Sequence, residues 1–417
     1  MLAGVPMHWM VKWAGAFPIF VDRASGARFV DVDGREYVDL CLGDTGAMTG
    51  HAPAATVAAI QRQVERGITF MLPTEDALWV GEELTRRFGL PYWQFALTAT
   101  DANRFSIRLA REITKRPFVL VFNGCYHGTV DETFIALENG KPVARRGNIG
   151  PPVDPSETTR VIEFNDVDAL EGALADGSVA CVLAEPVMTN VGIVHPEPGF
   201  HTALRSIARR YGSLLIIDET HTLCAGPGGC TRADGLEPDM LVVGKTIAGG
   251  IPAAAYGFTR DVGERIGAHV HKEESDTGGI GGTLAGNALS LAAMRSTLAD
   301  VLTDEAFARM MPVAQRFEAG VREAIERYGL PWHVTRLGCR AEYLFQPKPA
   351  RNGGEALASM DHELDRFMHL YSLNRGILMT PFHNMALMSP ATTAADVDRH
   401  TEVFAEAVAE LASSGGM

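Results

Sequence analysis

The sequence predicts an α/β protein built on a mostly parallel β-sheet, together with a smaller α+β domain. From about residue 52 to residue 300, helical patterns alternate with short apolar runs such as 118–122 and 214–217. Such runs, without polar positions, are typical of strands that helices cover on both faces, as in a parallel sheet. After about residue 300 the pattern changes to long amphipathic helices with a few strands, which indicates the smaller domain.

The N-terminal residues 1–51 are predicted to contribute to the smaller domain through three short strands, at 18–21, 28–32 and 36–40. An Asp-Gly pair at 33–34 lies between the last two strands, and this dipeptide favours the tight turn of a β-hairpin. The hairpin is expected to complete the smaller domain.

Two further regions are predicted, a large domain over residues 52–300 and a C-terminal small domain over residues 301–417. The candidate strands of the large domain are the apolar runs 118–122, 180–184, 214–217, 240–243 and 254–258. The expected elements of the C-terminal region are a helix over 304–328, strands within 333–346, a helix near 360–374 and a final helix from residue 394.

Length and composition narrow the class of protein. A chain of 417 residues is long enough for two domains and a large core. Its net charge of −14 argues against nucleic acid or an anionic membrane as the main partner. We find no apolar window of membrane-spanning length, and the first residues lack the regions of a signal peptide. The six cysteines have no C-x-x-C spacing, which favours a cytoplasmic protein without disulfides or a metal site.

Two residues at predicted strand ends indicate a particular chemistry. Lys245 follows the apolar run 240–243, and Asp218 follows the run 214–217. Open α/β sheets bind ligands beyond the carboxyl ends of their strands, where both side chains are expected. An enzyme that uses pyridoxal 5'-phosphate (PLP) needs a lysine for the cofactor aldehyde and an acid that keeps the pyridine nitrogen protonated. The pair therefore predicts a PLP site.

Four more segments resemble motifs of one enzyme family. They are Thr98-Ala99-Thr100-Asp101-Ala102, where the family has Ser-Gly-Thr-Glu-Ala, then Tyr126-His127-Gly128, Glu185-Pro186 and Gly281-Gly282-Thr283. Together with Asp218 and Lys245, they resemble the class III aminotransferases of PLP fold type I. The resemblance includes the branch of glutamate-1-semialdehyde aminomutase and the amine and β-amino-acid transaminases, and it covers about residues 4–412. It implies a seven-stranded sheet in the large domain.

The resemblance also implies the roles of individual residues. Lys245 and Asp218 are expected to be catalytic, with Lys245 holding PLP as an internal aldimine. The other residues expected to contact the cofactor are Thr98, Ala99, Thr100, Tyr126, His127, Glu185, Thr220, His221 and Thr283. Tyr126 is assigned to stacking on the pyridine ring, because neighbouring glycines leave its face open.

The phosphate loop departs from the family pattern, because Thr98 replaces the serine and Ala99 the glycine. The amides at the start of a helix still attract a phosphate. The alternative is that Thr100 or Asp101 simply caps this helix.

Thr283 implies a homodimer, because in relatives the threonine of this motif reaches the phosphate bound by the neighbouring subunit. The rival interpretation of 278–287 is a dinucleotide-binding glycine loop. That fingerprint needs a preceding strand, whereas the residues before it, 271–276, are polar. We therefore reject the nucleotide interpretation.

The expected activity is that of an aminotransferase that moves an amino group from a primary amine or amino acid to a keto acid or ketone. Two alternatives stay open. One is an aminomutase of the glutamate-1-semialdehyde type, and the other is a PLP-dependent lyase. A lyase acting on amino-alcohol phosphates needs a second anion site, for which no basic cluster is evident.

Substrate recognition depends on a few candidate residues. Relatives that bind carboxylates usually use an arginine, and the N-terminal arginine of β-amino-acid transaminases aligns with His8. With Trp9 beside it, His8 favours an aromatic or bulky amine. Lys12 or Arg340 could still supply a cation, although Arg340 could equally pair with a glutamate.

Overall fold

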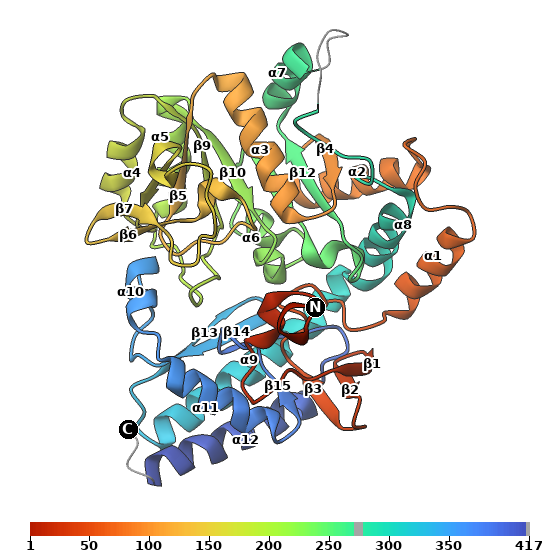
Figure 1. Ribbon diagram of the computed structural model, residues 1–417, viewed down its shortest axis with the longest axis vertical. Helices are drawn as coiled ribbons and strands as arrows, with labels where there is room; N and C mark the ends of the chain where they lie inside the picture. The colour runs from red at the N-terminus through yellow and green to blue at the C-terminus, as the bar shows by residue number, and fades with distance from the viewer. Residues whose placement is uncertain (271–277, 414–417) are drawn as a thin grey trace.

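The computed structural model describes residues 1–270 and 278–413. The chain forms a large α/β half and a smaller half, and the N-terminal segment lies between them (Figure 1). The smaller half contains the first three strands and the last helices of the chain.

The large half is built on a seven-stranded sheet with the order β4-β12-β11-β10-β9-β5-β8. Four neighbouring pairs are parallel, and β12 is antiparallel to both of its neighbours. The predicted mostly parallel, seven-stranded sheet is therefore confirmed. Its strands are β4 Tyr92–Ala96, β5 Phe118–Phe122, β8 Thr159–Ile162, β9 Val179–Ala184, β10 Leu214–Asp218, β11 Met240–Val243 and β12 Ala254–Phe258.

Two of these strands, β4 and β8, were not among the predicted runs, and both lie at the edges of the sheet. Edge strands are less completely covered than central ones, so they tolerate polar residues. Gln94 in β4 and Arg160 in β8 interrupt the apolar pattern for this reason.

Helices cover both faces of the sheet. Alternate side chains of a strand point to opposite faces, so Val121 packs in one apolar cluster and Leu120 in another. The first cluster includes α3 and α7, and the second includes α4 and α5. The helices of this half are α1 Ala54–Val64, α2 Glu75–Phe88, α3 Ala99–Thr114, α4 Val167–Leu174, α5 Phe200–Tyr211, α6 Gly229–Ala233, α7 Arg260–Val270 and α8 Ala288–Ser296.

The smaller half combines segments from both ends of the chain. Strands β1 Val21–Ser25, β2 Arg28–Asp31 and β3 Glu36–Asp39 form a sheet with β15 Ile377–Leu378. A second sheet contains β13 His333–Leu337, β14 Arg340–Leu344 and β16 Met385–Leu387. The helices are α9 Asp304–Arg327, α10 Gly353–Ala358, α11 His362–Leu373 and α12 Ala394–Ser413, and a separate hairpin in the large half joins β6 Ile135–Glu138 to β7 Lys141–Ala144.

One predicted strand is wrong. Residues 18–20 lie outside any strand, and the structure instead forms β1 at Val21–Ser25, which pairs with β2 in an antiparallel hairpin. Gly26 adopts a φ of 59° at the turn, which lets the chain reverse immediately after Ser25. The strand therefore forms directly before this turn, a few residues later in the sequence than predicted.

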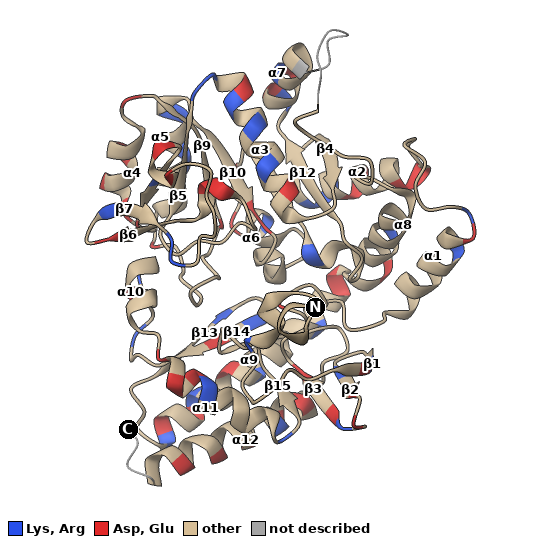
Figure 2. Ribbon diagram, viewed as in Figure 1, with Lys and Arg blue, Asp and Glu red and all other residues tan. Residues whose placement is uncertain are grey.

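The surface carries both signs of charge. Acidic and basic residues are interspersed along α3 and α11 (Figure 2). Among the helices of the described residues, none is both long enough and apolar enough to cross a membrane.

A buried arginine on α2 ties together three segments of the large half. The guanidinium of Arg87 donates to Glu83 on the same helix, to the carbonyl of Pro227, and to the carbonyls of Leu298 and Leu302. Its neighbour Arg86 also donates to Glu83, but from an exposed position.

These neighbours offer a matched pair of substitutions. We expect Arg87→Met to lower the free energy of unfolding by about 3–5 kcal/mol, because it leaves three carbonyls without their donor and removes one of the two arginines that pair with Glu83. Arg86→Met is expected to cost less than about 1 kcal/mol, since it removes only an exposed ion pair. Urea unfolding followed by circular dichroism measures both, and equal losses would contradict the interpretation.

Candidate active site

The carboxyl ends of β10 and β11 bring the two predicted catalytic residues together. The strands are parallel neighbours, with Asp218 opposite Val242. Lys245 follows two residues after the end of β11, where it begins a short 3-10 helix with a φ of 52°. Both side chains line a cavity of about 400 Å³. This volume is near the lower end of the range for ligand sites.

The Asp218 carboxylate is buried and held by three donors. Its Oδ2 accepts a hydrogen bond from Asn103 Nδ2 at 2.8 Å and lies 2.9 Å from His127 Nδ1. Its Oδ1 accepts the amide of Thr220 at 3.0 Å. Burial alone would raise the pKa of this carboxyl, but the hydrogen bond and positive charge of His127 lower it to about 2. Asp218 is therefore an anion at neutral pH.

The His127 ring stabilises the negative charge of the Asp218 carboxylate. Burial opposes the charged ring, but Cys125 and the Asp218 carboxylate together raise the pKa of His127 to about 10. The protonated ring can then donate from Nδ1 to Asp218. His127 was expected to contact the cofactor, and in the structure its Nδ1 contacts Asp218.

The amine of Lys245 contacts a residue that the sequence analysis missed. Its Nζ lies 2.8 Å from Asp44 Oδ2 and 2.9 Å from the Asp44 carbonyl oxygen. Burial would raise the pKa of the Asp44 carboxyl, but the Lys245 amino group and other nearby cations hold it well below its usual range. β3 ends at Asp39, and Asp44 lies in the segment that follows, within a Gly-Asp-Thr-Gly turn at 43–46 that was the available sequence signal.

This turn has an unusual backbone. Leu42, Asp44 and Thr45 have φ values of 46°, 50° and 81°, in a region that residues other than glycine rarely adopt. Conformations of this kind persist where the surrounding structure enforces them, and they often occur at functional sites. The turn delivers both a carboxylate and a carbonyl to one lysine.

The third neighbour of Lys245 is His221. The Lys245 Nζ lies 2.9 Å from His221 Nε2, while His221 Nδ1 lies 3.1 Å from both Thr45 Oγ1 and Arg340 Nη1. Burial, followed by the charge of Lys245, holds the pKa of His221 well below its usual value. His221 is therefore a neutral ring at neutral pH.

The first turn of α3 forms the side of the cavity where a phosphate is expected. Thr98 caps the helix, since its Oγ1 accepts the Asp101 amide at 3.1 Å and donates to Asp101 Oδ2 at 2.8 Å. The amides of Ala99 and Thr100 belong to the first turn, where amides lack acceptors within the helix. The helix is therefore capped by Thr98, and not by Thr100 or Asp101 as the capping alternative supposed, while the first-turn amides stay available to an anion.

Gly128 allows the loop after β5 to pack closely against the first turn of α3. The Oγ1 of Thr100 accepts the Thr129 amide at 3.0 Å. A Cβ on Gly128 would lie 2.1 Å from that same Oγ1. Only glycine at this position lets the loop after β5 close against the start of α3.

Aromatic side chains from distant segments meet beside the cavity. Tyr126 and Trp9 both line it, with ring centroids 5.6 Å apart. Trp9 also lies 6.1 Å from the Phe382 ring, and the ammonium of Lys12 lies 5.6 Å from the Trp9 centroid. Burial raises the pKa of Tyr126 to about 12, so its hydroxyl stays protonated.

Five predicted residues, Lys12 and the four described next, are not among those that line the cavity. Glu185 is buried and accepts hydrogen bonds from the amide and hydroxyl of Thr189. Arg340 is fully buried and donates to the Thr189 carbonyl at 3.1 Å. His8 and Thr283 are exposed on the described surface of the chain. The polar run 271–276, used against the nucleotide interpretation, lies outside the described residues.

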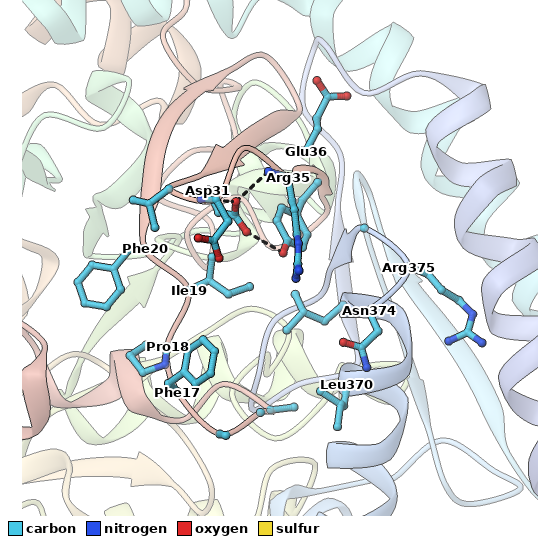
Figure 3. A pocket seen from close by; sticks show the side chains of 18 of the residues that line it. Phe17, Pro18, Ile19, Phe20, Asp31, Arg35, Glu36, Leu370, Asn374 and Arg375 are labelled. Carbon is cyan, nitrogen blue, oxygen red and sulfur yellow. Dashed lines mark hydrogen bonds between the residues drawn. The ribbon is translucent and has the colours of Figure 1, made fainter.

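A larger hollow of about 950 Å³ lies elsewhere, between the N-terminal segment and the end of α11 (Figure 3). None of the predicted site residues lines it. Its buried carboxylate, Asp31, is already bonded to the amides of Asp33 and Arg35 and to the Tyr37 hydroxyl. Its size therefore does not make it the better candidate.

The residues of the smaller cavity suit PLP, the cofactor that the sequence resemblance implies. Asp218 offers a buried anion, the start of α3 offers amides to a phosphate, and Lys245 offers a primary amine. The Thr220 Oγ1 is buried at the cavity without a partner among the described residues, so a donor or acceptor is available there to a ligand.

Comparison with known proteins identifies the family. The family model for class III aminotransferases matches residues 9–408. The chain belongs to the class III aminotransferase family. The predicted resemblance is thereby confirmed.

Several relatives carry the same enzyme name. The chain is 34% identical to a glutamate-1-semialdehyde 2,1-aminomutase of Sorangium cellulosum, over 95% of this chain and 90% of that one. A crystal structure of a glutamate-1-semialdehyde aminomutase from Pseudomonas aeruginosa is 54% identical, with a TM-score of 0.96 over 99% of this chain and 92% of that one. The crystal structure of an omega-transaminase from Sphaerobacter thermophilus is 29% identical, with a TM-score of 0.88 over 97% of this chain and 94% of that one.

The protonated His127 predicts a pH dependence of stability. A group whose pKa is raised on folding stabilises the native state fully below its unfolded value, near 6.5, and this contribution is lost as the pH rises toward 10. We expect the free energy of unfolding to fall by at least about 1 kcal/mol more in the native protein than in His127→Gln across this interval.

Urea unfolding at a series of pH values measures this difference. His362→Gln is the control, because its side chain is 85% exposed and should leave the pH profile unchanged. Parallel profiles for the native protein and His127→Gln would show that His127 is neutral in the folded state.

Proposed function

We propose that this protein is a PLP-dependent aminomutase of the glutamate-1-semialdehyde type, which moves an amino group between adjacent carbons of one substrate. Identity of 54% with an enzyme of that name, across nearly the whole chain, supports this activity over the transaminase predicted first. A lysine-to-alanine variant of the same enzyme has been crystallised in complex with PMP, the amino form of the cofactor. The observation that carries the proposal is the convergence of Lys245 and Asp218 on one cavity.

Each part of the cofactor has a corresponding residue in the cavity. Asp218 accepts a hydrogen bond from the pyridine nitrogen, and His127 and Asn103 keep that carboxylate oriented. The amides of Ala99 and Thr100 receive the phosphate. PLP held there would supply an electron sink, because its protonated ring would take up electron density from the bond that breaks at the carbon bearing the amino group.

The reaction requires a proton carrier beside the substrate, and Lys245 is the candidate. Its Nζ accepts the proton of the carbon that bears the amino group and returns it later, as a general base and then a general acid. Asp44 restrains the amine from one side and His221 from the other. Trp9 and Tyr126 restrict the access of water at the mouth.

A substrate of the glutamate-1-semialdehyde type carries a carboxylate, for which a cation is expected. Among the described residues that line the cavity there is no arginine. The ammonium of Lys12 lies over the rings of Phe382 and of Trp9, which lines the cavity. We therefore assign the substrate carboxylate to Lys12 in preference to Arg340, whose guanidinium is enclosed behind His221.

An amine transaminase is the second candidate function. The aromatic side chains at the mouth and the absence of arginine from the described cavity lining favour an apolar amine as donor. The similarity to an omega-transaminase is consistent with this activity. The two candidates differ in whether a separate keto acid is required.

This difference gives the test of function. Protein loaded with PMP should convert glutamate-1-semialdehyde to the isomeric amino ketone over many turnovers without any added keto acid. Lys245→Ala should lower the rate by at least about 10³-fold, because the proton carrier is lost. Product formation is followed by chromatography.

The outcomes separate the two proposals. A response only to 1-phenylethylamine plus pyruvate would reject the aminomutase and support the transaminase. Turnover that is undiminished in Lys245→Ala would reject the role of Lys245 in either reaction.

We also propose a homodimer in which Thr283 serves the site of the partner subunit. Thr283 is exposed and lies outside the lining of its own cavity, and its neighbour Leu284 is 51% exposed. Separately, Lys245→Ala and Thr283→Val are expected to be weakly active. Mixed after partial unfolding and refolding, they should regain activity, because each mixed dimer then holds one complete site.

The mixing experiment is decisive because, if Thr283 serves the partner subunit, both substitutions fall in the same site of the mixed dimer and leave the other site intact. Thr283→Val refolded alone gives the control rate. An activity of the mixture equal to the sum of its components would show that Thr283 serves its own subunit or neither.

A further inference from the structure

Asp44 is a carboxylate beside the cavity that none of the cofactor assignments uses. Within the described parts of the chain, Asp218 is the only carboxylate that lines the cavity, and it is assigned to the pyridine nitrogen. Asp44 does not itself line the cavity, but Gly43 and Gly46, close on either side of it, do. Its side chain contacts Lys245, so it lies directly behind a residue of the cavity wall.

Asp44 presents two acceptors to a single nitrogen. Its Oδ2 and its carbonyl oxygen lie 2.8 and 2.9 Å from Lys245 Nζ, and the carboxylate forms an ion pair with that ammonium group. A lysine ammonium has three hydrogens and no acceptor, and its hydrogen bonds to a carboxylate are strengthened by charge. The same arrangement suits any primary ammonium, because each presents the same three donors.

The turn that carries Asp44 is fixed without the help of Lys245. Asp39 Oδ1 accepts the amides of Cys41 and Leu42 at 2.9 and 2.7 Å. The amide of Asp44 donates to the Cys41 carbonyl at 3.1 Å. We therefore expect the Asp44 carboxylate to stay in place when the lysine amine moves.

The Asp44 carboxylate depends on its ammonium partner. Its Oδ1 is enclosed and has no hydrogen-bond partner among the described residues. When the Lys245 amine moves to the substrate carbon, as the proposed function requires, Oδ2 loses its donor as well. An enclosed carboxylate without donors costs free energy, so another cation is favoured there. The Asp44 side chain is 21% exposed, so a ligand can reach it.

The substrate of an aminomutase brings such a cation with it. In the proposed reaction, one nitrogen enters at the aldehyde carbon, whose oxygen leaves as water. One nitrogen then leaves the neighbouring carbon, which takes up water and becomes a ketone. The first carbon is reduced by two electrons and the second is oxidised by two, so no outside reductant is consumed. During the first transfer the amino group on the neighbouring carbon is idle, whereas a transaminase substrate needs no second amino group.

We propose that Asp44 binds the substrate amino group that is not being transferred, in the place that Lys245 Nζ occupies in the free protein. A substrate with an amino group on the neighbouring carbon thereby replaces the lysine at Asp44 and releases it toward the reacting carbon. A simple amine cannot make this exchange, so Asp44 determines specificity. The inference rests on the proposed aminomutase function.

The variant Lys245→Ala loaded with PMP isolates this site, because it lacks the ammonium that competes for Asp44. A lysine-to-alanine variant of the related Pseudomonas enzyme has been crystallised in complex with PMP. The probes are 4-aminopentanoate and pentanoate, which share the carboxylate assigned to Lys12 and differ in one amino group. PMP has no aldehyde and neither probe has a ketone or aldehyde, so isothermal titration calorimetry measures binding without reaction.

We expect Lys245→Ala to bind 4-aminopentanoate at least about tenfold more tightly than pentanoate, because only the former has an ammonium for Asp44. Adding Asp44→Asn should abolish this preference and leave the affinity for pentanoate unchanged. Asparagine tolerates the φ of 50° at this position, so the turn should be preserved. An undiminished preference in the double variant would overturn the proposal, since Asp44 would then serve Lys245 alone.

Two further variants guard against a damaged cavity. Asp44→Gly also removes the carboxylate and accepts the same φ, so it should give the same result as Asp44→Asn. Asp398→Asn is the control, because Asp398 pairs with Arg316 and its side chain is 45% exposed. In the Lys245→Ala background, this control should keep the full preference for 4-aminopentanoate. Its loss there would show that the preference does not depend on Asp44, which overturns the proposal.

The outcomes for Asp44 and for the proposed function are distinguishable. Native protein that does not isomerise glutamate-1-semialdehyde, beside an Asp44-dependent preference in Lys245→Ala, would reject the aminomutase and retain the ammonium site. Turnover by the native protein without any Asp44-dependent preference would retain the aminomutase and overturn the inference.

Discussion

The site depends on one buried negative charge at the carboxyl end of the sheet. Asp218 is removed from water, so its ionised form must be stabilised by protein donors alone. Those donors come from α3, from the loop after β5 and from the chain after β10. Each of these segments is therefore fixed relative to the others by the same carboxylate. The loop after β5 can approach α3 only because Gly128 carries no side chain. The contacts that hold these segments of the large half together are therefore the same contacts that form the cofactor site.

The sequence predicts the centre of this structure better than its edges. Central strands are recognisable because they are buried on both faces, and Asp218 and Lys245 stand out as polar residues at their ends. The edge strands β4 and β8 contain polar residues and escape the same criterion. The apolar residues 18–21 were predicted as a strand, but the turn at Gly26 places the strand at Val21–Ser25 instead.

The residues around Lys245 illustrate what a linear pattern does not contain. Asp44 and Arg340 reach the lysine region from segments far apart in the chain, and only the tertiary fold brings them there. Arg340 was predicted as a possible partner of the substrate, which its residue type allows. Its enclosure behind His221 follows from the pairing of β14 with its neighbours, which no local signal specifies. Residue type indicated the chemistry, and the fold determined which group each side chain meets.

The residues around Lys245 come from distant parts of the sequence, so they become available at different times while the chain is synthesised. When Lys245 has just been made, Asp44 and His221 already exist, but Arg340 has not yet been added to the chain. The large half can assemble its sheet soon afterwards, once β12 has been made, because all seven strands precede residue 259. The contact between Arg340 and His221 forms only after β14 has been made and the smaller half has docked. The surroundings of the lysine are therefore completed late, once most of the chain has been made.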